Sequence, residues 1–166
     1  MPPVLDISSL LVRLASSKVD FVVVGGVAVI AHGYERNTKD LDVCYSRDPA
    51  NLDALGAVLV DLGARLRNID EDIPFVPDAR TLRGMEILTL DTPEGGLDLL
   101  VDPDGSPGYE ALKANAERID FDGFEILIAS IEHLLAMKRA ANRPQDQTDV
   151  EALLAIQRLE RPQNGL

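Results

Sequence analysis

The chain has 166 residues, with 16 Lys and Arg against 28 Asp and Glu, so its formal net charge is −12. This acidity argues against a protein that coats nucleic acid or binds anionic membranes, because both need a broadly basic surface. Apolar residues make up 46% of the chain, which is typical of a folded domain. At this length we expect one domain over residues 1–160, followed by a flexible tail at 161–166.

Cysteine use and hydropathy predict where the protein works. The single cysteine, Cys44, cannot form an internal disulfide. The N-terminal sequence lacks the basic start and long apolar stretch of a secretory signal, and no apolar run approaches the roughly 20 residues that cross a bilayer. We therefore expect a cytoplasmic protein that does not bind membranes.

The first half of the chain alternates predicted helices and strands. Helices are expected where apolar residues recur at helical spacing after a capping residue, and strands where β-branched residues cluster. In chain order these elements are a helix at 7–14 capped by Asp6 or Ser8, a strand at 21–24, a short helix at 27–31, a strand at 41–45 and a helix from Pro49 to Gly63. Between Arg65 and Gly84 the periodicity is lost, and we expect a long loop or irregular arm.

Two hairpins and three helices are predicted for the second half. They are a hairpin of strands 85–90 and 97–101, a helix at 109–116, a hairpin of strands 118–121 and 124–128 around Asp122-Gly123, and helices at 131–141 and from Pro144 onward. This order predicts a mixed α/β (α+β) fold, in which helices flank one central sheet and further helices end the chain.

The segment from Gly25 to Asp42 carries the most chemical information. Asp40 and Asp42 lie on the same face of their predicted strand, because side chains alternate along a strand. Two adjacent carboxylates repel each other unless a cation lies between them, and Mg²⁺ prefers such oxygen ligands. Gly25 and Gly26 have no Cβ, so a ligand can approach the backbone closely, and the helix that follows offers N–H groups to a phosphate. The pattern predicts phosphates and a metal in one cleft.

The segment GGVAVIAHGYERNTKDLDV, residues 25–43, resembles the DNA-polymerase-beta-like nucleotidyltransferase superfamily. The signature of that superfamily is an apolar-Gly-Gly/Ser turn followed by an Asp-x-Asp/Glu strand. The sequence of this segment is most similar to the bacterial branch that includes abortive-infection-type toxin nucleotidyltransferases. The resemblance covers most of residues 18–156. It implies a nucleotidyltransferase-like mixed sheet and transfer of a nucleoside monophosphate from an NTP to an acceptor hydroxyl, with Mg²⁺ in a two-metal site.

The resemblance also implies roles for individual residues. Asp98, in Gly96-Leu97-Asp98-Leu99-Leu100, matches the third carboxylate of the superfamily. Asp40, Asp42 and Asp98 are then the metal ligands and catalytic acids, with Asp98 weakening or accepting the proton of the attacking hydroxyl. Lys138 would be a catalytic cation, with Asp146 and Asp149 following on the next helix. The residues expected to bind the nucleotide are Gly25, Gly26, Arg36 and Thr38.

Simpler structural roles compete with these assignments. A Gly-Gly pair is also a common strand-to-helix turn. Asp91 and Asp102 are rivals of Asp98, because each lies at a predicted strand end. Lys138 also suits a helix C-terminus, where a cation offsets the helix dipole.

The acceptor is the most open part of the prediction. The leading hypothesis is an RNA such as the tRNA 3′ end, in a toxin–antitoxin setting with a cognate antitoxin as partner. It predicts a local positive strip made of Arg65, Arg67, Arg80, Arg83, Lys138, Arg139 and Arg143. The alternatives are a small molecule such as an aminoglycoside, a protein side chain, and an inactive nucleotide-binding module that lacks the third carboxylate or has a blocked cleft.

Overall fold

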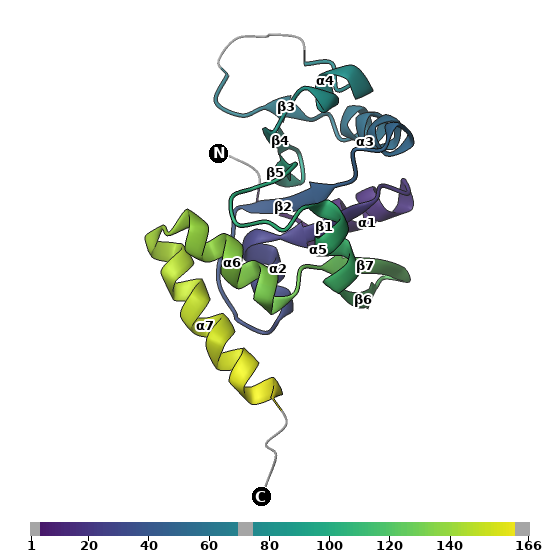
Figure 1. Ribbon diagram of the computed structural model, residues 1–166. Helices are drawn as coiled ribbons and strands as arrows, with labels where there is room; N and C mark the ends of the chain where they lie inside the picture. Colours follow the sequence, from purple (N-terminus) through teal and green to yellow (C-terminus); the bar gives the residue numbers. More distant parts are fainter. Residues whose placement is uncertain (1–3, 70–74, 162–166) are drawn as a thin grey trace, which may run out of the picture.

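The computed structural model describes residues 4–69 and 75–161, which are built around a seven-stranded mixed sheet (Figure 1). The strand order is β3-β4-β5-β2-β1-β7-β6. The strands are β1 (Phe21–Val24), β2 (Asp40–Tyr45), β3 (Arg65–Leu66), β4 (Ile87–Thr92), β5 (Gly95–Leu100), β6 (Glu117–Phe121) and β7 (Phe124–Ile128). The expected α/β fold with a mixed central sheet is confirmed.

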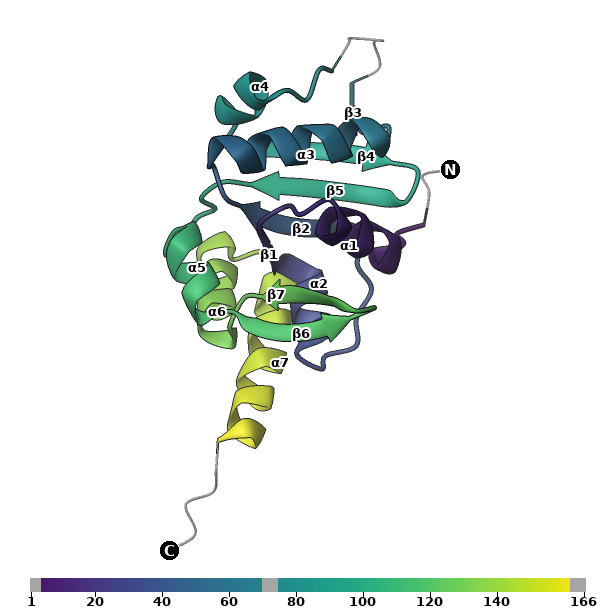
Figure 2. The ribbon, with the colours of Figure 1, turned by 90° about the vertical axis from the view of Figure 1, so that its right-hand side faces the viewer.

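Seven helices in the described residues flank this sheet. They are α1 (Ile7–Ser16), α2 (Gly25–Ala31), α3 (Pro49–Asp61), α4 (Ala79–Arg83), α5 (Tyr109–Asn115), α6 (Ile131–Ala141) and α7 (Pro144–Glu160). Figure 2 shows α1 and α3 in front of the sheet, with α6 and α7 on the opposite side. Across residues 4–69 and 75–161, no helix is long and apolar enough to cross a membrane.

The core lies between the sheet and the helices on both of its sides, and it includes Leu134 of α6 and Leu153 of α7. All four residues of β1 are buried, as are Leu10 and Leu14 of α1 and Leu55 and Leu59 of α3. Local signals position these helices: the Asp6 carboxylate accepts a hydrogen bond from the Ser9 amide at 2.9 Å and so caps α1. The apolar helical faces read from the sequence are therefore the faces that pack inward.

Strand pairing at the centre of the sheet determines where the polar side chains meet. Strand β2 runs parallel to β5, and their register places Asp42 level with Asp98. On its other side β2 is antiparallel to β1, which places Val24 opposite Asp42. The turn after β1 therefore lies beside the two carboxylates, although Gly25, Asp42 and Asp98 are far apart in the sequence.

The expected irregular arm between Arg65 and Gly84 is partly ordered, which corrects the prediction. Strand β3 pairs with β4 at the edge of the sheet, and α4 is capped by the Asp78 carboxylate, which accepts a hydrogen bond from the Thr81 amide at 2.7 Å. Both elements are too short to show a periodic pattern. Residues 70–74 lie outside the described part of the chain, as does the expected tail except for Arg161.

Candidate active site

Three carboxylates from two parallel strands form what we call the acid cluster: Asp40 and Asp42 of β2 and Asp98 of β5. Leu41 lies between Asp40 and Asp42, and Val43 follows Asp42. Both are buried on the other face of β2, as alternation predicts. Burial raises the pKa of Asp42 to about 7, with further contributions from the negative charges of Asp98 and Asp40. Burial also raises the pKa of Asp98, against the effect of the nearby Arg67 guanidinium. The cluster thus carries more negative charge than its surroundings compensate.

The register separates Asp98 from its two rivals for the third carboxylate. Asp91 lies on β4 and is level with Gly96, whereas Asp98 lies on β5 and is directly level with Asp42. Asp102 follows β5 and lines a neighbouring cavity. Of the three candidates, Asp98 has the position that a shared cation with Asp42 requires.

Gly25 and Gly26 make room for the side chains of the site itself. Gly25 has a φ of +65°, and a Cβ there would collide with the carboxylate of Asp42. A Cβ on Gly26 would collide with the guanidinium of Arg36 and lie 3.0 Å from Oγ1 of Thr38. Helix α2 begins at Gly25 rather than at Val27, so both glycines belong to its first turn. The predicted strand, glycine turn and helix are present, and the glycines are needed for close approach.

The donor set of the acid cluster fits a divalent cation. Its ligands are hard carboxylate oxygens, and the side chain missing at Gly25 leaves a cradle beside Asp42, which takes part in no ion pair among the described residues. Within residues 4–69 and 75–161, no three His, Cys, Asp or Glu side chains are already arranged around one point as ligands. Instead of a cation from solution, an arginine contacts Asp40: Nη2 of Arg67 lies 3.2 Å from its Oδ1.

Arg67 is a part of the site that sequence reasoning missed. It was expected on a positive strip, but its guanidinium enters the acid cluster instead. Nη2 lies 2.9 Å from Oδ1 of Asp98, and Nε lies 2.9 Å from Oδ1 of Asp91. Arg67 stands in the aperiodic arm just after β3, so no local pattern could indicate that its side chain reaches across β4.

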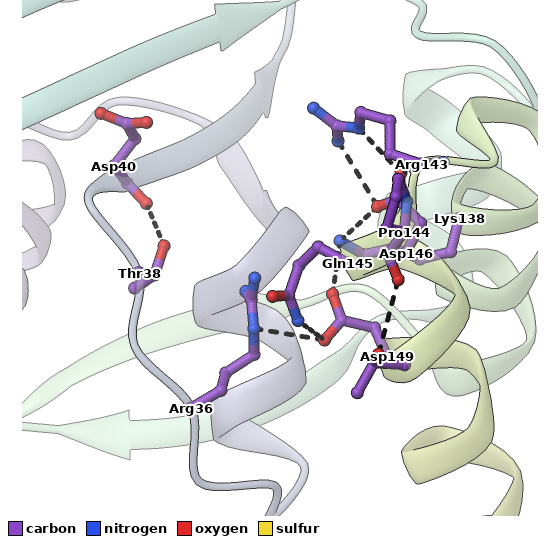
Figure 3. Close-up of polar contacts among 10 residues, drawn as sticks. Arg36, Thr38, Asp40, Lys138, Arg143, Pro144, Gln145, Asp146 and Asp149 are labelled. Carbon is purple, nitrogen blue, oxygen red and sulfur yellow. Dashed lines mark hydrogen bonds and ion pairs between the residues drawn. The ribbon is translucent and has the colours of Figure 1, made fainter.

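A second group of charged residues, here called the ion network, lies where α6 meets α7 (Figure 3). Nζ of Lys138 lies 3.1 Å from Oδ1 of Asp146 and 2.9 Å from Oδ2 of Asp149. Nε of Arg36, which comes from the segment before β2, lies 3.2 Å from Oδ1 of Asp149, and Nε of Arg143 donates to Oδ2 of Asp146 at 2.8 Å. Asp149 is fully buried and Lys138 nearly so. The pairing of Lys138 with the acids of the following helix, implied by the resemblance, is present.

Two cavities meet at Asp42. The first, of about 360 Å³, lies along the acid cluster and collects four cationic side chains, from Arg36, Lys39, Lys138 and Arg143; Thr38 also lines it, and its hydroxyl donates to the Asp40 carbonyl at 3.1 Å. The second, of about 310 Å³, has an apolar wall and both acids and cations in its lining, because it shares Lys138 and Arg143 with the first cavity. Its apolar residues include Val24, Ile87, Leu100 and Met137, and its acids include Glu86, Asp102 and Asp104.

The expected positive strip is not formed. Arg67, Lys138 and Arg143 surround the site but are paired with carboxylates. The remaining four belong to two parts of the fold: Arg65 is on β3 and Arg80 and Arg83 are on α4, two elements at the upper end of Figure 1, whereas Arg139 is on α6, near the middle of that view. Three of the seven expected cations are thus paired with carboxylates, and the other four are divided between these two parts of the fold.

Comparison with solved structures identifies the class of fold. No family model matches the chain, and no curated protein matches it. Among solved structures, the lincosamide antibiotic adenylyltransferase LnuA, bound to lincomycin, superposes with a TM-score of 0.60 at 18% identity, over 89% of this chain and 94% of that one. A nucleotidyltransferase-like antigen from Paracoccidioides brasiliensis gives a TM-score of 0.54 at 20% identity, over 92% and 74%. ANT(2'')-Ia in complex with adenylyl-2''-tobramycin gives 0.52 at 16% identity, over 88% and 84%. The chain therefore has the nucleotidyltransferase fold.

Proposed function

We propose that the protein is a metal-dependent nucleotidyltransferase, which moves a nucleoside monophosphate from an NTP to an acceptor hydroxyl. The observation that carries this proposal is the register of β2 and β5, which places Asp42 level with Asp98 beside the cradle at Gly25. A half-buried carboxylate pair on rigid parallel strands is costly for folding alone, and it suits the binding of a divalent cation with substrate phosphates.

The chain's own residues have distinct parts in this reaction. Asp40, Asp42 and Asp98 would hold Mg²⁺, which supplies charge neutralisation to the triphosphate when bound. The cations of the first cavity, among them Arg36 and Lys138, face the same space and favour a polyanionic ligand there. In the transfer, the acceptor oxygen bonds to the α-phosphorus, the bond from that phosphorus to the pyrophosphate oxygen breaks, and a carboxylate, assigned to Asp98, takes the hydroxyl proton.

For the acceptor, the second cavity favours a small cationic molecule over RNA. Besides Lys138 and Arg143, which it shares with the first cavity, its lining carries three further acids, Glu86, Asp102 and Asp104, that would attract amines, and its apolar wall suits a compact hydrocarbon ring. A volume of about 310 Å³ lies in the range of small-molecule sites. Two proteins of the same fold have titles that name such ligands, lincomycin and adenylyl-2''-tobramycin. RNA in a toxin–antitoxin setting stays the second candidate, supported by the resemblance of residues 25–43.

A label-transfer assay tests the proposal. The full chain is incubated with Mg²⁺ and each α-³²P-labelled NTP, together with tRNA, total RNA, or a panel of aminoglycosides and lincosamides. We expect label on a small molecule with wild type and with Asp53→Asn, an exposed acid of α3, but not with Asp42→Asn. Label on RNA alone would instead support the second candidate. No label on any acceptor, with no NTP binding by calorimetry, would refute nucleotidyl transfer.

A further inference from the structure

Arg67 reaches the acid cluster from the edge of the sheet. It follows β3, and its backbone amide donates to the Thr89 carbonyl of β4 at 3.0 Å. Its side chain then crosses β4, where Nη2 donates to the Leu90 carbonyl at 2.8 Å and Nε donates to Asp91 at 2.9 Å. The same Nη2 lies within ion-pair distance of Asp40 and Asp98. The guanidinium is thus fixed at one end by Asp91 and Leu90 and placed with the other end between two cluster carboxylates.

Gly96 provides the passage for this side chain. It lies in register between Asp91 of β4 and Asp40 of β2, in the row that the guanidinium crosses. A Cβ at this position would lie 2.6 Å from Nη2 of Arg67 and would collide with Oδ1 of Asp40. The contact is mainly electrostatic, because Oδ1 of Asp98 is buried and accepts no hydrogen bond. The site therefore has a slot that fits a flat cation between Asp40 and Asp98.

We propose that Arg67 is a built-in cation of the acid cluster, which holds Asp40 and Asp98 so that the cluster binds one divalent cation, anchored at Asp42, instead of two. This inference rests on the proposed metal-dependent function and deepens it. The geometry supports it: Nη2 of Arg67 occupies the space between Asp40 and Asp98, where a second ion would have to bind, and Asp42 is the member that no cation contacts in the described residues. Without Arg67 the same three carboxylates would attract a second ion.

Counting bound Mn²⁺ tests this assignment without any measurement of activity. Mn²⁺ is titrated into the nucleotide-free full chain, and free Mn²⁺ is followed by electron paramagnetic resonance. We expect one ion per chain for wild type and two for Arg67→Gln. The matched control is Arg65→Gln, which removes an exposed arginine from β3 that forms no ion pair in the described residues, and which should bind one ion. Circular dichroism verifies that the variants fold.

Each result decides the question. Two ions in wild type, or one ion in both wild type and Arg67→Gln, would overturn the role of Arg67 and leave the proposed function standing. No Mn²⁺ binding in either protein would overturn the role of Arg67 together with the metal-dependent function. If Arg67→Gln does not fold, the wild-type count still tests the claim, because the proposal requires it to be one.

Discussion

The acid cluster has half-buried carboxylates and the ion network has fully buried ones, and their charges are arranged differently. In the ion network, Asp146 and Asp149 contact the cations Lys138, Arg36 and Arg143 within the chain. In the acid cluster, three carboxylates share one arginine, and Asp42 has none. The pKa values move accordingly: burial and like charges raise the pKa of Asp42 to about 7, while hydrogen bonds from Arg143 and Lys138 outweigh burial and lower the pKa of Asp146.

This difference predicts that the two regions respond differently to the absence of a ligand. A charge network that is compensated within the chain holds one arrangement of α6, α7 and the segment before β2 even before a ligand enters the first cavity. A cluster with excess charge destabilises the empty fold and gains free energy when a cation binds. Substitutions in the two regions should therefore affect activity and stability in opposite proportions.

The largest effect is expected for Asp42→Asn. Loss of this carboxylate should lower the rate of nucleotidyl transfer by about a thousandfold, or about 4 kcal/mol, because the anchor of the metal is removed. Stability should move the other way: in metal-free buffer at pH 8 the free energy of unfolding should rise by about 1 kcal/mol or more, since a repelled buried charge is gone. Label transfer and urea unfolding measure the two effects. A variant that loses both activity and stability would make Asp42 a structural residue.

Asp149→Asn probes the other region and should mainly reduce stability. It leaves Lys138 and Arg36 buried without their shared carboxylate, which costs about 3–5 kcal/mol. The shift of the urea midpoint measures the loss. Glu151→Gln, an exposed acid on the same helix, is the control and should change stability by less than about 0.5 kcal/mol. Equal effects of the two substitutions would show that the network contributes no net stability.

The pH dependence of stability should have opposite signs in the two regions. The pKa of Asp42 is 3.8 when unfolded and about 7 when folded, so its contribution is complete below about pH 4 and is lost as the pH rises through 7. The loss is about 4 kcal/mol in metal-free buffer. Asp146, whose folded pKa is lowered, contributes above its unfolded value of 3.8 and loses this as the pH falls below it.

Urea unfolding of wild type and Asp42→Asn between pH 4 and 8 isolates the contribution of Asp42 to the pH dependence of stability. Their difference in free energy of unfolding should change with pH across this window, and saturating Mg²⁺ should remove the change, because the metal selects the ionised carboxylates. A difference that is constant from pH 4 to 8 would contradict the raised pKa of Asp42.

Local chemistry explains why one part of the site could be predicted and another could not. Alternation along β2 is sufficient to place Asp40 and Asp42 on one face, and the helix expected at 131–141 is α6, which the Ser130 side chain caps. Arg67 depends on a two-residue edge strand and on the gap at Gly96, two strands away. The positive strip failed for the same reason: the sequence shows which residues are cationic, but not which carboxylates the fold brings to them.

The smallest effect is expected for Arg143→Gln, and it tests which part of the ion network stabilises the fold. The Arg143 side chain is 72% exposed, although it bonds to an Asp146 that is 1% exposed. Lys138 would still contact Asp146, and the backbone amide of residue 143 would still donate to it, so the loss of stability should stay within about 1 kcal/mol, as for exposed pairs. The test is urea unfolding beside Asp149→Asn. A loss of 3 kcal/mol or more would mean that the exposed Arg143 side chain holds α7 in place together with the buried Lys138 and Asp149. The stability of the network would then depend on a side chain that solvent reaches.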